Sequence, residues 1–231
     1  MKKATKMTSL QIVVFCLMAV MAGCTLGIVG TASLLASNLL GVGGKVVGAC
    51  LFSLGIYAII IFEMKLFTGM VSNIPKMPVK DYWQLAVCFI CNMIGVGIVA
   101  LVVWGTSLAD LVVPQGQSVI ESKFAVDNWA LSSFCSSILC GALITMSVWS
   151  PKYASQKGIA STVGILLPII VFVFCGFDHS VANMLYFYFF GEFSGRVIGY
   201  ILLSILGNIV GGVALPLVIL LKEKSNKQKT D

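Results

Sequence analysis

The sequence predicts an all-α membrane protein with six transmembrane helices in two inverted three-helix repeats. Three observations lead to this class. First, 58% of the 231 residues are hydrophobic and only 10% are charged, whereas a soluble domain carries about 25% charged residues. Second, the apolar residues gather in six stretches separated by polar loops. Third, the two halves share short motifs at matching places. This composition excludes a soluble globular enzyme, a disordered chain and a nucleic-acid-binding protein.

Each apolar stretch is long enough to cross a bilayer, which requires about 20 predominantly apolar residues. The second and fifth stretches are longer than this and carry polar residues in their interior. The expected spans are residues 10–36, 44–74, 82–107, 127–149, 158–190 and 196–221. They form a single transmembrane domain over residues 1–231, with tails at 1–9 and 222–231 and repeat halves at about 10–107 and 127–221.

Positive charge is distributed unevenly between the two sides of the expected bundle. The termini and the loops after spans two and four carry the excess, whereas the cations Lys45, Lys123 and Arg196 on the other side are offset by acidic residues. Because cytoplasmic loops are rich in Lys and Arg, both termini are predicted to be cytoplasmic. The residues on the cytoplasmic side are Lys2, Lys3, Lys6, Lys76, Lys80, Lys152, Lys157, Lys222, Lys224, Lys227 and Lys229.

An Asn-x-x-Gly motif occurs in the third span of each half, from Asn92 to Gly95 and from Asn208 to Gly211. Since each half has an odd number of spans, the two halves must have opposite topology. An asparagine in such a motif can serve close helix packing by bonding a neighbouring backbone. Packing beside an interrupted span also helps to build a pore, so both asparagines are expected at the pore.

The interruptions of the second and fifth spans indicate a binding site near the middle of the membrane, as interrupted segments at matching places in two repeats do in transporters. The second interruption contains His179, the only histidine of the chain, between Asp178 and Ser180 and shortly before Asn183. Ionisable groups at that depth are costly and usually mark a pathway. A structural histidine is the alternative, but the crowding of polar residues favours function.

The run from Asp178 to Ser180 does not indicate a hydrolase, because three adjacent side chains do not converge as a catalytic triad does. No enzyme activity and no cofactor are therefore expected. The eight cysteines all lie in apolar stretches and are interpreted as packing residues, so no metal site and no disulfide framework are expected.

The first interruption contains Glu63 and Lys65. Lys65 either neutralises Glu63 or Asp178 in a buried pair or attracts an anion toward the pore, and the sequence leaves both open. Backbone N–H groups freed by the interruptions also favour small anions. The other expected pore residues are the donors Thr68, Ser180 and Asn183 and an apolar constriction of Leu66 and Phe67.

Two segments resemble the signature interruptions of the formate/nitrite transporter family, which includes formate, nitrite, hydrosulfide and lactate channels. They are residues 66–69 (Leu-Phe-Thr-Gly) and 176–184 (Gly-Phe-Asp-His-Ser-Val-Ala-Asn-Met), and the resemblance covers roughly residues 18–218. It implies an aquaporin-like protomer with broken second and fifth helices, assembled as a homopentamer in a bacterial inner membrane, with His179 as the central pore histidine. The family usually has an acidic residue where this chain has Lys65, and often an asparagine where it has Gly141.

Together, the residues and the resemblance predict a channel for small monovalent anions of weak acids, such as formate, nitrite or hydrosulfide. The expected partners are the anion or its conjugate acid, the lipid bilayer and further copies of the chain, with no nucleic acid. His179 either donates a proton, so that the neutral acid crosses, or donates only a hydrogen bond to an anion that passes unchanged. The alternatives are a neutral-solute channel and a non-conducting sensor or assembly subunit on the same scaffold.

Overall fold

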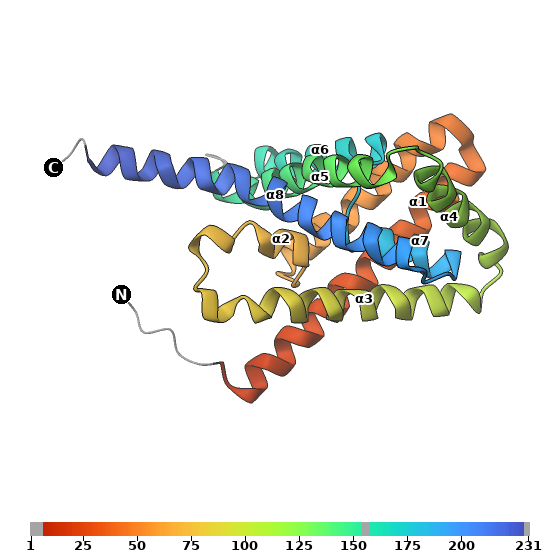
Figure 1. Cartoon of the computed structure of the whole chain (residues 1–231), viewed down its shortest axis with the longest axis horizontal. Coiled ribbons are helices and arrows are strands. Elements are labelled where there is room, and N and C mark those ends of the chain that lie inside the picture. Colours follow the sequence, from red (N-terminus) through yellow and green to blue (C-terminus); the bar gives the residue numbers. More distant parts are fainter. Residues whose placement is uncertain (1–6, 154–157, 229–231) are drawn as a thin grey trace.

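The chain folds into a bundle of helices in which two short helices, α2 and α7, lie among the long ones (Figure 1). The computed structural model describes residues 7–153 and 158–228, and these ranges contain no strand. The α-helices are α1 (Ser9–Ile61), α2 (Phe67–Val71), α3 (Trp83–Trp104), α4 (Ala109–Phe124), α5 (Trp129–Tyr153), α6 (Ile159–Cys175), α7 (Asn183–Phe190) and α8 (Gly195–Lys227), and two 3₁₀ turns cover Ile74–Lys76 and Val79–Asp81. The predicted all-α class is confirmed.

Helix α1 folds back on itself at Gly41. The backbone of Gly41 has φ 56° and ψ −127°, a conformation that glycine adopts far more readily than other residues. Gly44 then passes so close to the first arm that a Cβ atom there would lie 2.1 Å from the carbonyl oxygen of Ala36. The two arms of α1, red and orange in Figure 1, therefore run back along each other. The expected boundary between the first two spans is a turn inside α1.

The second and fifth expected spans each contain a helix, a non-helical stretch and a short helix. The second arm of α1 ends at Ile61 and α2 begins at Phe67, while α6 ends at Cys175 and α7 begins at Asn183. Among the described residues, four helical segments are long and apolar enough to cross a membrane, namely Ser9–Ile61, Val79–Trp104, Trp129–Tyr153 and Gly195–Lys227. The count of six spans stays a prediction, because α1 has two arms and the fifth span is divided between α6 and α7.

Helical structure also occurs outside the expected spans. Helix α4 lies in the linker between the two halves, and α8 continues to Lys227, so part of the predicted tail at 222–231 is helical. The buried face of α4 consists of Val112, Val113, Gly116 and Ile120. Lys2, Lys3, Lys6, Lys157 and Lys229, on which the orientation prediction partly rests, lie outside the described residues.

The start of α1 and the end of α8 lie at the same end of the molecule (Figure 1). Met7, Lys76 and Asp81 line one pocket, and Lys76 pairs with Glu223 near the end of α8 at 3.5 Å. The loop after the second expected span and the end of α8 are thus neighbours, and the charge pattern assigns both to the same side of the membrane.

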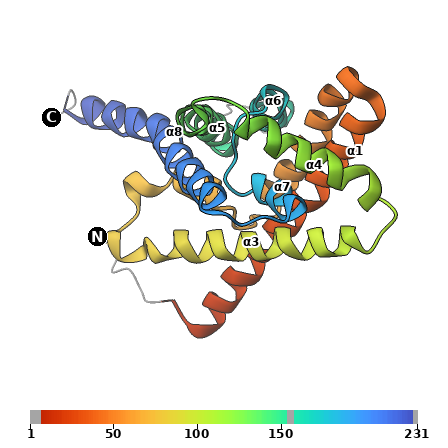
Figure 2. The ribbon, with the colours of Figure 1, turned by 45° about the vertical axis from the view of Figure 1, so that its right-hand side comes forward.

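Helix α7 occupies the interior, where it packs against α3 and α4 (Figure 2). Its side chains Met184, Leu185, Phe187 and Phe189 are at most 1% exposed, whereas large apolar side chains cover the outside of the bundle. Leu101 of α3, for example, is 75% exposed. Contiguous exposed apolar surface of this kind marks a protein whose surroundings are not water. The fold therefore holds one short helix, and the interruption before it, in a fixed place inside a lipid-facing shell.

Candidate pore

The two interruptions meet inside the bundle through Thr68 and His179. Thr68 lies in the first turn of α2, and His179 lies in the interruption between α6 and α7. Thr68 Oγ1 and His179 Nε2 are 3.0 Å apart, and both residues are 1% exposed. Residues from opposite halves of the sequence are thus brought into direct contact.

The hydrogen bonds of His179 define which ring nitrogen carries the proton. The backbone N–H groups of Val181 and Ala182 both donate to His179 Nδ1, at 3.2 and 3.1 Å. Since Nδ1 is an acceptor, a neutral ring carries its proton on Nε2. The Nε2–H group then donates a hydrogen bond to Thr68 Oγ1. The ring also stacks on Phe172, with centroids 5.8 Å apart. His179 is therefore held as a neutral hydrogen-bond donor whose Nε2 faces the other interruption.

Asn92 of α3 holds the first interruption in place. Its Nδ2 donates to the carbonyl oxygens of Ala19 and Lys65 at 2.7 and 2.8 Å, and its Oδ1 accepts from the backbone N–H of Phe67 at 2.9 Å. Backbone groups outside a helix must find partners within the membrane. Asn92 supplies them on both sides of Leu66, which is why a buried asparagine stands there.

Asn208 of α8 makes the corresponding bonds at the second interruption. Its Nδ2 donates to the carbonyl oxygens of Ser137 and Asp178 at 2.8 and 2.9 Å, and its Oδ1 accepts from the backbone N–H of Ser180 at 2.9 Å. The hydroxyl of Ser180 is buried and has no hydrogen-bond partner among the described residues. Asn208 thus positions the backbone on both sides of His179.

Asp178 does not point toward Lys65 but is enclosed by donors from three helices. Its Oδ1 accepts from Lys123 Nζ at 2.5 Å, from Asn183 Nδ2 at 2.9 Å and from Tyr200 Oη at 2.5 Å. The side chain of Asp178 is 4% exposed and that of Lys123 is 19% exposed. The buried pair considered for Lys65 and Asp178 is therefore wrong, because Lys123 occupies that place.

The charge pattern places Lys123 on the side opposite the termini, outside the expected spans. A signal was nevertheless present, since Val112, Gly116, Ile120 and Lys123 follow the three-to-four-residue spacing of a buried helix face. That spacing places Lys123 on the side of α4 that faces the bundle.

Lys65 lines a cavity of about 300 Å³ together with Glu63, Leu66 and Lys152. Within residues 7–153 and 158–228, Lys65 forms no ion pair with Glu63 or any other carboxylate. Leu66 and Phe67 are each 4% exposed. Leu66 faces this cavity, whereas the Phe67 ring packs edge-on against Phe89 of α3, with centroids 5.2 Å apart.

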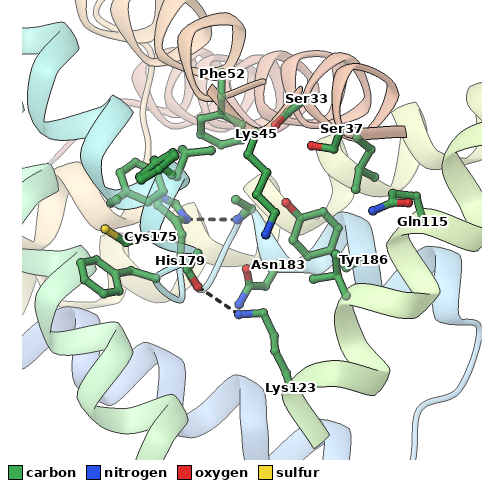
Figure 3. A pocket seen from close by; sticks show the side chains of 18 of the residues that line it. Ser33, Ser37, Lys45, Phe52, Gln115, Lys123, Cys175, His179, Asn183 and Tyr186 are labelled. Carbon is green, nitrogen blue, oxygen red and sulfur yellow. Dashed lines mark hydrogen bonds between the residues drawn. The ribbon is translucent and has the colours of Figure 1, made fainter. Parts of the chain in front are cut away.

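A second cavity, of about 320 Å³, is lined by His179 itself. We call it the His179 vestibule, and the cavity lined by Lys65 the Lys65 vestibule. Figure 3 shows Lys45 and Lys123 reaching into the His179 vestibule, near His179 and Asn183. Phe52 and Phe172, which the sequence did not single out, line it next to the histidine. The described lining residues of the two vestibules do not overlap.

The arrangement offers donors and cations but no assembled metal site. In the described ranges, no three His, Cys, Asp or Glu side chains gather where they could hold a metal ion. The polar groups at the Thr68–His179 contact are a hydroxyl and an imidazole N–H, and the described lining of each vestibule includes two lysines. Such groups stabilise negative charge on a small solute.

A sequence model described as "Formate/nitrite transporter" matches residues 1–221 of the chain. The chain belongs to the formate/nitrite transporter family. This family member is 30% identical over 186 residues to the uncharacterized transporter YrhG of Bacillus subtilis, covering 73% of this chain and 67% of that relative. It is also 30% identical over 199 residues to a probable formate transporter of Methanothermobacter thermautotrophicus, covering 73% of this chain and 71% of that relative.

The formate channel FocA of Escherichia coli K12 is 27% identical over 150 residues, which covers 61% of this chain and 52% of that relative. The match thus spans about half the length of FocA. Among solved structures, an "FNT family ion channel" has a TM-score of 0.78 at 24% identity and covers 93% of this chain and 92% of that one. A "pentameric formate channel with formate bound" has a TM-score of 0.71 at 19% identity, covering 94% and 97%.

These two likenesses show the fold of the formate/nitrite transporter family member described here. Its family and its apolar helices make it a multi-pass membrane protein. Relatives in the family are channels and transporters rather than enzymes.

Proposed function

We propose that this protein is a channel for small monovalent anions of weak acids, with formate, nitrite and hydrosulfide as the substrate class. The observation that carries the proposal is the contact between Thr68 and His179. His179 lines one vestibule, the sequence neighbours Leu66 and Gly69 of Thr68 line the other, and both vestibules contain lysines. The relatives named as formate channels support the same substrate class.

The charges of the vestibules favour an anion over a neutral solute. No carboxylate is among the described residues that line the His179 vestibule. Lys45 forms no ion pair within the described ranges, and Lys123 is bonded to the carboxylate of Asp178. Among its described lining residues, the Lys65 vestibule has Lys65 and Lys152 against a single carboxylate, that of Glu63. A neutral solute gains little from such a charge balance, whereas a monovalent anion is concentrated at both mouths.

In our proposal His179 acts as a hydrogen-bond donor to an anion that passes unchanged. A neutral imidazole that gave up its Nε2 proton would become an anion unless Nδ1 gained a proton in exchange. Nδ1 faces two backbone N–H groups, those of Val181 and Ala182, which leave no room for that proton. The hydroxyl of Thr68 offers a second donor next to His179 Nε2, so an anion exchanges water for two donors as it passes the apolar side chains.

We propose six spans in two inverted three-helix repeats, with broken second and fifth spans and one pore in the single domain of residues 1–231. The matching hydrogen bonds of Asn92 and Asn208 support the repeat. We further propose a homopentamer in a bacterial inner membrane with both termini cytoplasmic, supported by the pentameric formate channel of similar fold. Native mass spectrometry of the detergent-purified protein tests the assembly, because a stable monomer or dimer would contradict it.

Flux measured in proteoliposomes tests the function. Formate, nitrite, hydrosulfide and acetate are compared side by side, with glycerol as the neutral solute and empty liposomes as the control. Faster flux of one or more anions than in empty liposomes, with no glycerol flux, supports the proposal. Glycerol flux without anion flux indicates a neutral-solute channel, and the absence of any flux indicates a non-conducting scaffold.

A further inference from the structure

We propose that Lys45 and Tyr186, together with the hydroxyls of Ser33 and Ser37, form an anion-docking site in the His179 vestibule. A carboxylate or similar small oxyanion binds there before it reaches His179. This inference rests on the proposed channel function, because it assigns the binding step that precedes passage through the pore.

Lys45 is the cation of this vestibule whose charge is available. The ammonium of Lys123 is bonded to the carboxylate of Asp178 at 2.5 Å and to the carbonyl oxygen of Gly176 at 3.2 Å. Its charge is therefore largely cancelled within the protein. Lys45 has no hydrogen-bond or ion-pair partner among the described residues, so its field acts on whatever enters the cavity.

Neutral donors surround the same space without partners of their own. Ser33, Ser37, Gln115 and Tyr186 all line the vestibule, and within the described ranges their side chains make no hydrogen bond to the protein. Figure 3 shows the Lys45 side chain extending across the pocket toward the side occupied by Tyr186 and Asn183. An ammonium with hydroxyl groups and no carboxylate matches the oxygen atoms of a small anion.

Lys45 follows shortly after the turn inside α1, so this turn determines the position of its backbone. Gly44, the preceding residue, lies against the backbone of Ala36 so closely that it accepts no side chain. Ser33 and Ser37 lie on the opposite arm of the same hairpin. The hairpin therefore presents the ammonium and the two hydroxyls from one element, facing Tyr186 of α7.

The place of the site determines its role. His179, Phe52 and Phe172 line the same cavity, so an anion held by Lys45 is next to the donors and the aromatic side chains that it must pass. Lys45 is therefore expected to lower the concentration at which anions half-occupy this side of the channel. Since Lys45 is not among the hydrogen-bond partners of Thr68 and His179, the maximal flux should change much less.

Cys175 provides a readout of occupancy that does not depend on transport. It is exposed and lines the His179 vestibule. In protein with Cys50 and Cys135 changed to alanine, the rates of reaction with an anionic and a cationic methanethiosulfonate are measured on Cys175, with and without sodium formate. The variants are Lys45→Gln, Lys45→Arg and Tyr186→Phe, and Lys222→Gln is the matched control on an exposed part of α8.

We expect Lys45→Gln to lower the anionic-to-cationic rate ratio about tenfold and to raise the half-protective formate concentration by a similar factor. Lys45→Arg and Lys222→Gln should behave as the parent protein does. Tyr186→Phe should weaken protection without changing the rate ratio.

The docking site would be overturned if Lys45→Gln left the rate ratio and the protection by formate unchanged, or if sodium formate did not protect Cys175 of the parent protein. Protection that depends on Lys45 in a protein that carries no anion flux would retain the site and overturn the proposed channel function.

Discussion

Asn92 and Asn208 make the same three hydrogen bonds at the two interruptions, although they come from opposite halves of the chain. In each case the side-chain amide bonds one carbonyl oxygen of a neighbouring helix. It also bonds one carbonyl oxygen and one backbone N–H of the interruption. This correspondence places Lys65 and Asp178 at equivalent positions, because their carbonyl oxygens accept the equivalent bond. The two breaks are thus built alike, but the equivalent position holds a lysine in one and an aspartate in the other.

The first prediction concerns these asparagines. Asn92→Ala or Asn208→Ala leaves buried peptide groups without partners, at a cost of about 1–3 kcal/mol for each group. We expect a lower Tm of the detergent-purified protein and a loss of flux in both variants. Asn38→Ala is the control, because Asn38 is exposed and water can replace its bond to the carbonyl oxygen of Leu111. A normal Tm for either core variant would show that water or another group satisfies the interruption.

The second prediction concerns His179. If its Nε2 donates only a hydrogen bond, His179→Asn keeps a donor near the same place, so part of the flux should remain, with the pH dependence of the parent protein. His179→Phe removes the donor and should abolish flux. Both are measured as initial rates of formate uptake between pH 5 and pH 8, about the range in which an ordinary histidine titrates. A pH profile in His179→Asn that differs from the parent profile would instead favour the proton-donor model.

The sequence predicts where the candidate pore has its centre, because polar residues that interrupt an apolar span are visible in the hydropathy pattern. Asp178, His179 and Asn183 stand out within apolar segments, and the matching interruption contains Thr68. A hydropathy pattern does not predict the direction in which each side chain points. Thr68 meets His179, whereas Phe67 turns toward Phe89.

The pairing of Asp178 with Lys123 could not be predicted from the sequence for a similar reason. Lys123 lies in a polar linker by composition, and only the fold of α4 against the bundle brings it to the carboxylate. Phe52 and Phe172 were missed because apolar residues in apolar spans carry no distinguishing signal. Their edge-to-face contact, with centroids 5.8 Å apart, depends on how α1 and α6 pack.

The third prediction concerns Lys65, which is not bonded to a carboxylate in the described structure. Lys65→Met should therefore leave yield and Tm unchanged. It should lower anion flux, by up to about a hundredfold if a permeating anion comes within about 6 Å of the ammonium at an effective dielectric constant near 20. Flux at low and high ionic strength checks the electrostatic origin, because screening should reduce the difference. Unchanged flux in a well-folded variant would make Lys65 a solvated residue of the vestibule.

The fourth prediction contrasts Lys123 with Lys65. Lys123→Met leaves the carboxylate of Asp178 without its ammonium partner, and breaking such a buried pair costs about 3–5 kcal/mol. We expect poor expression and loss of assembly on size-exclusion chromatography. Lys123→Met combined with Asp178→Asn should recover part of the assembly, because Asn183 and Tyr200 can still bond an amide oxygen. Failure of the double variant to recover any assembly would show that the charge of Asp178 is needed for more than pairing with Lys123.

The last prediction concerns Gly141, where the resemblance to the family leads us to expect an asparagine. A Cβ atom on Gly141 would lie 2.4 Å from the carbonyl oxygen of Asn208, and one on Gly23 would lie 2.1 Å from that of Asn92. Both glycines therefore allow a helix backbone to approach the asparagine that holds an interruption. Gly141 in this chain serves close packing rather than leaving an empty place in the pore.

Gly141→Ala should accordingly lower stability by about 1–3 kcal/mol, as overpacking does in a filled core, and Gly141→Asn should lower it further. Since the clash is with the backbone of Asn208, flux should fall together with the Tm of the purified protein. Gly195→Ala is the matched control, because a Cβ atom on Gly195 meets nothing within 4 Å. If Gly141→Asn kept the parent Tm and changed only which anion is carried, the asparagine of the relatives would act on the substrate, and the packing explanation for Gly141 would be wrong.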